Sequence, residues 1–185
     1  MPSRSITIQN QIIEWKQELK YLGVVLVSAK RFKINNQSVK HKFFRAVNSV
    51  FGKVGLSTSA ELSCSLINAH CIPILLFASE ALYWSAKNLR SMANVYNQAF
   101  YKIFKTFDNE VIRNCQFYMN ILPFNLLIDL WRLNFVDSIK NMVIYVNCRE
   151  EIKTIMHRYG FVQNVYQANN WKAEIWKYFD NEINI

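Results

Sequence analysis

The chain has 185 residues, of which 51% are hydrophobic and 19% charged, and its net charge is +9. Apolar and aromatic side chains run along its whole length, which excludes a disordered chain, and the size fits one domain or slightly more. Four glycines and three prolines are too few for the many tight turns of a sandwich or barrel, so the composition favours long helices. The scattered glycines also exclude a Gly-rich phosphate loop.

The positive charge is concentrated in the first third of the chain. Residues 1–60 hold ten Lys or Arg against two Glu, whereas residues 61–120 carry a net +1 and residues 121–185 are neutral. Between Leu19 and Ala60 there is no acidic residue. Such an asymmetry indicates an anionic partner, either nucleic acid or a membrane surface. The alternative is a face that only keeps the protein in solution.

The spacing of the cysteines indicates whether the chain has a metal site, and the lengths of its apolar runs indicate where in the cell it is located. No pair of cysteines has the C-x-x-C spacing of a zinc ribbon or a redox motif, so we expect free, buried thiols and no metal site. No signal peptide is visible after Met1, and the apolar run 71–78 is far shorter than the roughly 20 residues of a membrane span. We therefore expect an intracellular chain, cytoplasmic or nuclear, without a membrane span.

The N-terminal segment has strand character. Over residues 5–28, Ile6 and Ile8 alternate with polar neighbours, residues 9–11 form a turn candidate, and residues 21–27 include a β-branched run. These patterns predict a short hairpin or a three-stranded element. Near residue 35 the hydrophobic period changes to 3.6, which is typical of helices.

The first predicted helix covers residues 38–51 and has two distinct faces. Its inward positions are Val39, Phe43, Val47, Val50 and Phe51. The opposite face carries Ser38, Lys42, Arg45, Ser49 and Lys53. Gly52 and Gly55 are the expected stops.

Further helices follow along the chain. Thr58 begins a capping-box spacing that predicts a helix over 59–70, and Pro73 should interrupt it before a buried helical piece over 74–83. Ser85 should cap a long helix over 86–106, with the inner stripe Leu89, Met92, Ala93, Tyr96, Phe100, Ile103 and Phe107. Pro123 should start a helix with Leu127, Leu130, Trp131 and Val136 inward. Shorter helices are expected over 149–159 and 170–182.

No catalytic centre can be named from the residues alone. The four aspartates are Asp108, Asp129, Asp137 and Asp180, and no two are adjacent. No nucleophile lies beside a base in a recognisable pattern, and no metal-ligand cluster is present.

Four landmarks in order nevertheless resemble a known family. They are Lys20-Tyr21-Leu22-Gly23-Val24, then Lys42-Phe43-Phe44-Arg45-Ala46, then residues 71–81, and finally the Asn97–Phe100 helix followed by Leu122-Pro123. Their order and spacing resemble the C-terminal part of the reverse transcriptases of LINE-like, non-long-terminal-repeat retrotransposons. The resemblance covers roughly residues 5–135.

The resemblance implies a division of the chain and a set of site residues. Residues 1–34 would form a β element like the primer-grip edge of a palm, residues 35–142 a helical thumb-like bundle, and residues 143–185 a C-terminal helical extension of unknown role. The fold class is then mainly α, with a short N-terminal β-hairpin element. The primer-grip positions would be Tyr21, Leu22 and Gly23. The nucleic-acid-binding positions would be Lys30, Arg31, Lys33, Lys42, Arg45 and Lys53.

The resemblance also implies partners and a missing activity. A thumb holds RNA or an RNA–DNA duplex by its backbone. In the family, magnesium is held by palm aspartates upstream of the primer grip, and this chain lacks them. We therefore expect a polymerase fragment that is inactive alone, holds no cofactor and is completed by a missing palm and fingers segment.

The aromatic excess supports a second hypothesis. The chain has 5 Trp, 9 Tyr and 13 Phe, most of them at helical spacing. A helical protein-interaction module without a nucleic-acid role would also fit, and exposed apolar surface would favour self-association.

Overall fold

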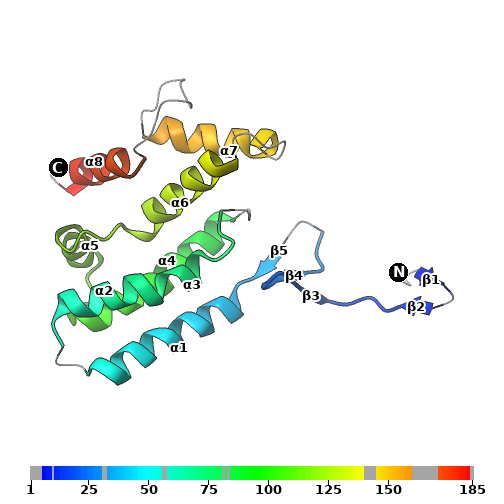
Figure 1. The fold of residues 1–185 in the computed structure, drawn as a ribbon, viewed down its shortest axis with the longest axis horizontal. Coiled ribbons are helices and arrows are strands. Elements are labelled where there is room, and N and C mark those ends of the chain that lie inside the picture. Colours follow the sequence, from blue (N-terminus) through cyan, green and yellow to red (C-terminus); the bar gives the residue numbers. More distant parts are fainter. Residues whose placement is uncertain are drawn as a thin grey trace. The chain divides into compact units, whose positions relative to one another are not determined.

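A computed structural model describes residues 6–9, 11–30, 33–55, 58–80, 82, 84–139, 145–159 and 171–183. Over these residues the chain is mainly helical, and its strands all precede its first helix (Figure 1). The predicted fold class is therefore confirmed. The chain divides into two compact units, Met1–Ser38 and Val39–Ile185.

The first unit contains two small antiparallel sheets. One is a hairpin of β1 (Ile6–Ile8) and β2 (Gln11–Ile13). The other has the strand order β3-β4-β5, formed by β3 (Glu18–Tyr21), β4 (Val24–Val27) and β5 (Lys33–Asn35). The sequence pattern thus predicts strands in the correct region, but it does not separate the two sheets.

A tight turn joins β3 to β4. Tyr21 pairs with Val24, so only Leu22 and Gly23 form the loop. Their φ angles are 45° and 83°, and a two-residue loop with both angles positive is a type I′ turn. Glycine adopts this conformation freely, whereas an L-residue at Leu22 is strained. The Leu22 side chain is 76% exposed, so packing does not explain its presence.

Replacing Leu22 by asparagine should stabilise this hairpin. Asn-Gly is the preferred pair for a type I′ turn, and relief of the strain is worth about 1 kcal/mol. Hydrogen exchange of the β3 and β4 backbone amides should therefore slow about fivefold. Leu22→Ala is the control, because alanine keeps the unfavourable φ. Unchanged exchange in Leu22→Asn would show that the turn does not limit hairpin stability.

The second unit is built from helices. They are α1 (Gln37–Val54), α2 (Ala60–His70), α3 (Ile72–Leu76), α4 (Ala86–Phe104), α5 (Asn109–Tyr118), α6 (Phe124–Ile139), α7 (Tyr145–Arg158) and α8 (Trp171–Ile183). None of the helices in the described residues is long and apolar enough to cross a membrane. The α7 and α8 helices contact the rest of this unit through α6 and α5.

The α1 helix has the two faces that its sequence predicts. Phe43 and Val47 are 0% and 1% exposed, so the apolar stripe faces the core. The helix continues through Gly52, so the predicted stop at that residue is wrong, and it ends before Gly55. Gly55 has φ of 78° and donates its N–H to the Phe51 carbonyl, as in a left-handed helix cap.

Serine hydroxyls cap two of the helices. Ser85 accepts from the Asn88 N–H at the start of α4, as predicted. At the start of α2 the cap is Ser59, which accepts from the Leu62 N–H, rather than Thr58. The Thr58 hydroxyl instead donates to the Val54 carbonyl at the end of α1.

Two helices are shorter than their hydrophobic patterns predict. The predicted interruption near Pro73 is present, since α2 ends at His70 and α3 begins at Ile72 with Pro73 in its first turn. However, α3 ends at Leu76, so the predicted extent of 74–83 is wrong. Phe77 has extended backbone, and Ala78 has φ of 58°. At the end of α4, Lys105 has φ of 54°, so the inner stripe does not reach Phe107, which is 84% exposed.

Two further differences concern α5 and α6. No element is assigned from the sequence to residues 109–118, where α5 forms with the Asp108 carboxylate accepting from the Glu110 N–H. On α6, the predicted inward position of Trp131 is wrong, since this residue is 39% exposed, whereas Leu130 and Val136 are buried as predicted.

The second unit has two hydrophobic cores. The first gathers buried residues of α1 to α4, with Ile112 of α5 and the first turns of α6. The second joins α6, α7 and α8. Leu127 packs against both cores, and the buried Tyr96 hydroxyl donates to the Leu122 carbonyl at 2.7 Å. The predicted boundary after residue 34 falls shortly before the division at Ser38.

Candidate nucleic-acid interface

Three cations form an exposed stripe along α1. Lys42, Arg45 and Lys53 are all exposed, on the side of the helix away from Phe43 and Val47. At about 100° per residue, the three directions fall within about 80° of one another. No acidic residue occurs anywhere in α1. The structure therefore brings together this part of the predicted binding set, hereafter the α1 stripe.

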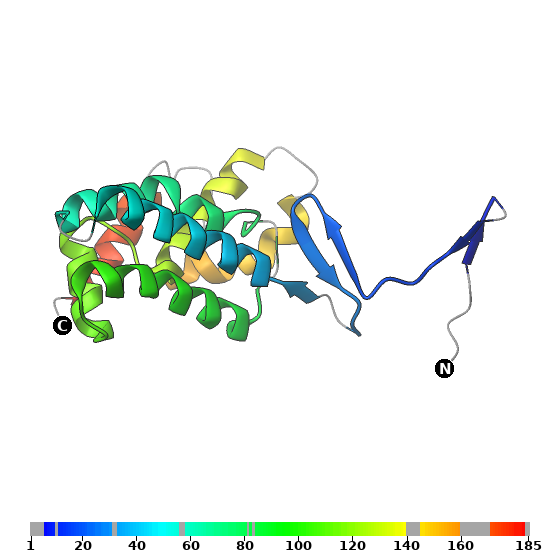
Figure 2. The same cartoon turned by 90° about the horizontal axis from the view of Figure 1, so that it is seen from below.

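The α4 helix lies beside α1 and runs in the same direction. Near the start of both helices, Lys40 Nζ donates to Ser91 Oγ at 2.6 Å. Near their ends, Lys102 Nζ donates to Asn48 Oδ1 at 2.8 Å. Figure 2 shows the two helices side by side. Like α1, α4 contains no acidic residue. The two helices together form what we call the α1–α4 pair.

The pair adds cations that the sequence did not assign to the interface. Lys87 and Arg90 are exposed in the first turns of α4, and Lys102 and Lys105 are exposed at its end. The amphipathic pattern places several of these residues outward. It does not reveal that α4 lies against α1, because this pairing depends on the path that the chain takes through α2 and α3 between the two helices.

The remaining predicted residues lie in the first unit. Lys30 and Lys33 are exposed, and Arg31 lies outside the described residues. Tyr21 is 62% exposed and lies next to the type I′ turn of Leu22 and Gly23. The three predicted primer-grip positions thus lie at the turn of one hairpin. The α1 stripe belongs to the second unit.

Two of the free cysteines in the described part of the chain are buried in the first core. Cys64 and Cys71 are buried, and burial raises the pKa of each thiol to about 11. Both thiols are therefore protonated at neutral pH and are poor nucleophiles and poor metal ligands. Within the described ranges, no three His, Cys, Asp or Glu side chains gather in a way that could hold a metal ion.

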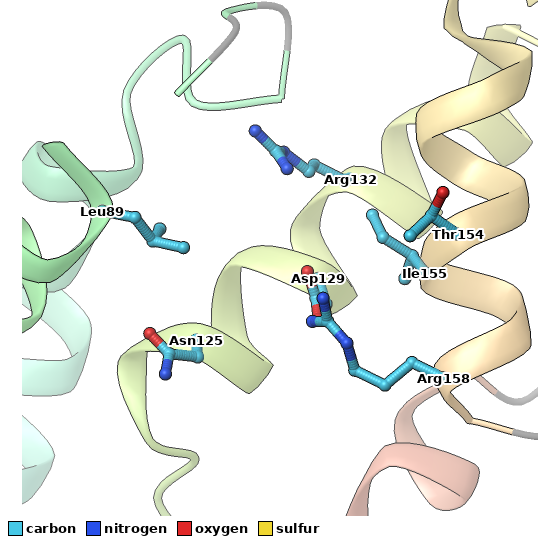
Figure 3. Close-up of a pocket in the computed structure, with 7 residues that line it drawn as sticks. All are labelled: Leu89, Asn125, Asp129, Arg132, Thr154, Ile155 and Arg158. Atoms are coloured by element: carbon cyan, nitrogen blue, oxygen red, sulfur yellow. The ribbon is translucent and has the colours of Figure 1, made fainter. Parts of the chain in front are cut away.

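A buried carboxylate joins α6 to α7. Asp129 is 5% exposed, and its Oδ2 accepts from Arg158 Nη1 at 2.5 Å and from the Tyr159 hydroxyl at 2.8 Å. Burial raises the pKa of Asp129, and its hydrogen bond with Tyr159 and the charges of Arg158 and Arg132 oppose that rise. Figure 3 shows Asp129 and Arg158 meeting in a cavity of about 420 Å³. This cluster fastens the two helices.

The Asp129 cluster was not predicted from the sequence. The available signal was a lone acid among Ile128, Leu130 and the other apolar residues of α6. A carboxylate in such a run is either exposed or paired inside the core. Its partners lie about thirty residues later, at the last residue of α7 and the residue that follows it, so their identity depends on the tertiary packing.

Comparisons with protein-family models, with curated proteins and with solved structures give no match to this chain. A function for this chain is therefore inferred from its own residues. Among the described residues, the α1–α4 pair is the feature that combines exposed cations with neighbouring helices free of acidic residues.

Proposed function

We propose that this chain binds the backbone of a nucleic-acid duplex through the α1–α4 pair. The observation that carries the proposal is the exposed α1 stripe of Lys42, Arg45 and Lys53 beside a second helix that also lacks acidic residues. Exposed Lys and Arg neutralise phosphates and release counterions, which is the main source of affinity that does not depend on sequence. A face that only keeps the protein in solution would ordinarily carry both acidic and basic residues.

The spacing of the stripe suits contact with a duplex. Lys42 and Lys53 are separated by eleven residues, which corresponds to about 16 Å along a helix axis. Two side chains this far apart can contact separate phosphates along the backbone of one duplex. The polar side chains of Asn48 and Ser91 lie along the same pair and suit contacts with phosphate and sugar.

We further propose that the chain is the primer-grip and thumb portion of a LINE-like reverse transcriptase. Support comes from the ordered landmarks, from a Tyr-Leu-Gly hairpin and from the helices that follow it. Its partner would be RNA or an RNA–DNA duplex inside the cell. Among its four aspartates no two are adjacent, so primer extension with magnesium would need a separate palm segment.

Salt dependence tests the duplex-binding proposal. If about four phosphates are neutralised, the logarithm of the association constant should fall against the logarithm of salt concentration with a slope of roughly −3 to −4. Fluorescence anisotropy of a labelled RNA–DNA duplex, repeated from about 50 to 200 mM salt, would measure it. An association constant that does not change with salt concentration would contradict the proposal.

A protein-interaction role is the second candidate, and exposed apolar side chains favour it. They include Ile12, Trp15, Leu19, Tyr21, Leu22, Phe107 and Tyr118. Association through apolar surface depends little on salt, unlike phosphate binding. Sedimentation at low and high salt would therefore separate self-association from duplex binding.

A further inference from the structure

A cavity lies where α1 and α4 end and α2 begins. Its volume is about 480 Å³, which is within the range of small-ligand sites. The described residues that line it are Phe51, Thr58, Ser63, Lys102, Ile103 and Lys105. The cavity therefore adjoins one end of the α1–α4 pair, and we call it the end cavity.

The end cavity is positively charged. It is lined by two lysines, and none of its described lining residues is acidic. The acids nearest in sequence are at other sites. Glu61 lines a different cavity, with Tyr118 and Asn120, and the Asp108 carboxylate caps α5 through the Glu110 N–H. An anion in the end cavity would therefore meet two ammonium groups.

One donor of the end cavity, the Lys102 ammonium, is held in place. Lys102 Nζ donates to Asn48 Oδ1 at 2.8 Å and lies 5.9 Å from the centre of the Phe51 ring. An ammonium has three N–H donors, so two remain for a ligand. Ser63, which is only 4% exposed, also lines the cavity and supplies a hydroxyl. A cation positioned in advance loses little side-chain entropy when it binds an anion.

We propose that the end cavity binds the terminal phosphate of a nucleic-acid strand. A phosphate monoester carries a charge of about −1.5 to −2 at neutral pH, which matches two lysines better than the single charge of a backbone diester. A strand end can also enter a cavity, whereas a backbone phosphate has a nucleoside on both sides. This inference rests on the proposed function and extends it from the length of the duplex to its end.

The test compares two duplexes of identical sequence. One carries phosphates at its 5′ and 3′ ends, and the other carries hydroxyls. The wild-type chain should bind the phosphorylated duplex about tenfold more tightly, the gain expected from a charge-assisted hydrogen bond. Lys102→Gln and Lys105→Gln should each reduce this ratio towards one. Lys172→Gln on α8 is the matched control and should leave the ratio unchanged.

The ratio of the two duplex affinities is measured for each protein separately, so a loss of stability in a variant would not by itself change this ratio. Lysines at helix C-termini also offset the helix dipole, and circular dichroism will show whether each variant is folded. Equal binding of the two duplexes by wild type would overturn the inference and leave the proposed function intact. Failure to bind either duplex would overturn both.

Inorganic phosphate provides a second arm. At constant ionic strength, it should raise the melting temperature of wild type more than that of Lys102→Gln, since a ligand stabilises the state that binds it. If inorganic phosphate stabilises the wild-type chain but the chain does not prefer the phosphorylated duplex, the end cavity binds free phosphate instead. That result would overturn the strand-end assignment.

Discussion

Replacing both Lys42 and Arg45 by glutamate should lower duplex affinity roughly a hundredfold near 0.1 M salt. Each reversal replaces an attraction of about 1 kcal/mol with a weaker, screened repulsion. The loss should be similar for every duplex sequence, because phosphates carry no base identity. The salt slope should also become shallower by about two, one for each phosphate that is no longer neutralised. Anisotropy titrations of the same duplex measure both effects.

The matched control reverses two lysines elsewhere in the same unit. Lys172 and Lys177 are exposed on α8, in a region with equal numbers of acidic and basic residues. Lys172→Glu with Lys177→Glu makes the same change in net charge and should weaken binding much less. Equal losses from the two double variants would mean that net charge, rather than the α1 stripe, attracts the duplex.

Phe43→Ala should cost about 3–5 kcal/mol of unfolding free energy. Phe43 is 0% exposed and anchors α1 in the first core, so its removal leaves a cavity beneath the α1 stripe. Domains of this kind are typically stable by about 5–15 kcal/mol, so this loss is a large share of the total. Urea unfolding followed by circular dichroism would measure it.

Phe107→Ala is the control with the same chemistry. Phe107 is 84% exposed and touches Tyr101 only edge-on, with ring centroids 5.5 Å apart. Its truncation should cost less than about 1 kcal/mol, because it removes only that aromatic pair. If the two truncations cost the same, the assignment of Phe43 to the core and of Phe107 to the surface would be wrong.

The sequence predicts α1 and α4 well because strong apolar periodicity and clear end signals agree. Ser85 caps α4, and Gly55 ends α1. The two helices that are predicted too long end where an L-residue adopts a positive φ, at Ala78 and Lys105. Periodicity continues through such a position, and neither residue type signals a left-handed turn. A prediction made from hydrophobic periodicity therefore extends each of these helices too far.

The candidate site is only partly predictable, for a different reason. The α1 stripe lies on one helix, so the spacing of Lys42, Arg45 and Lys53 is sufficient to find it. The end cavity combines Ser63 of α2 with Lys102 and Lys105. Residues of three helices meet there through tertiary packing, which no local sequence pattern predicts.

The separation of the two cores has a consequence for local unfolding. The buried side chains beneath the α1–α4 pair belong to the first core, whereas α7 and α8 contribute to the second. Opening of α7 and α8 would expose the outer face of α6 but leave Phe43 and Tyr96 enclosed. We therefore expect α7 and α8 to open locally at a lower free energy than the α1–α4 pair, so that the proposed duplex-binding surface persists while these two helices open and close.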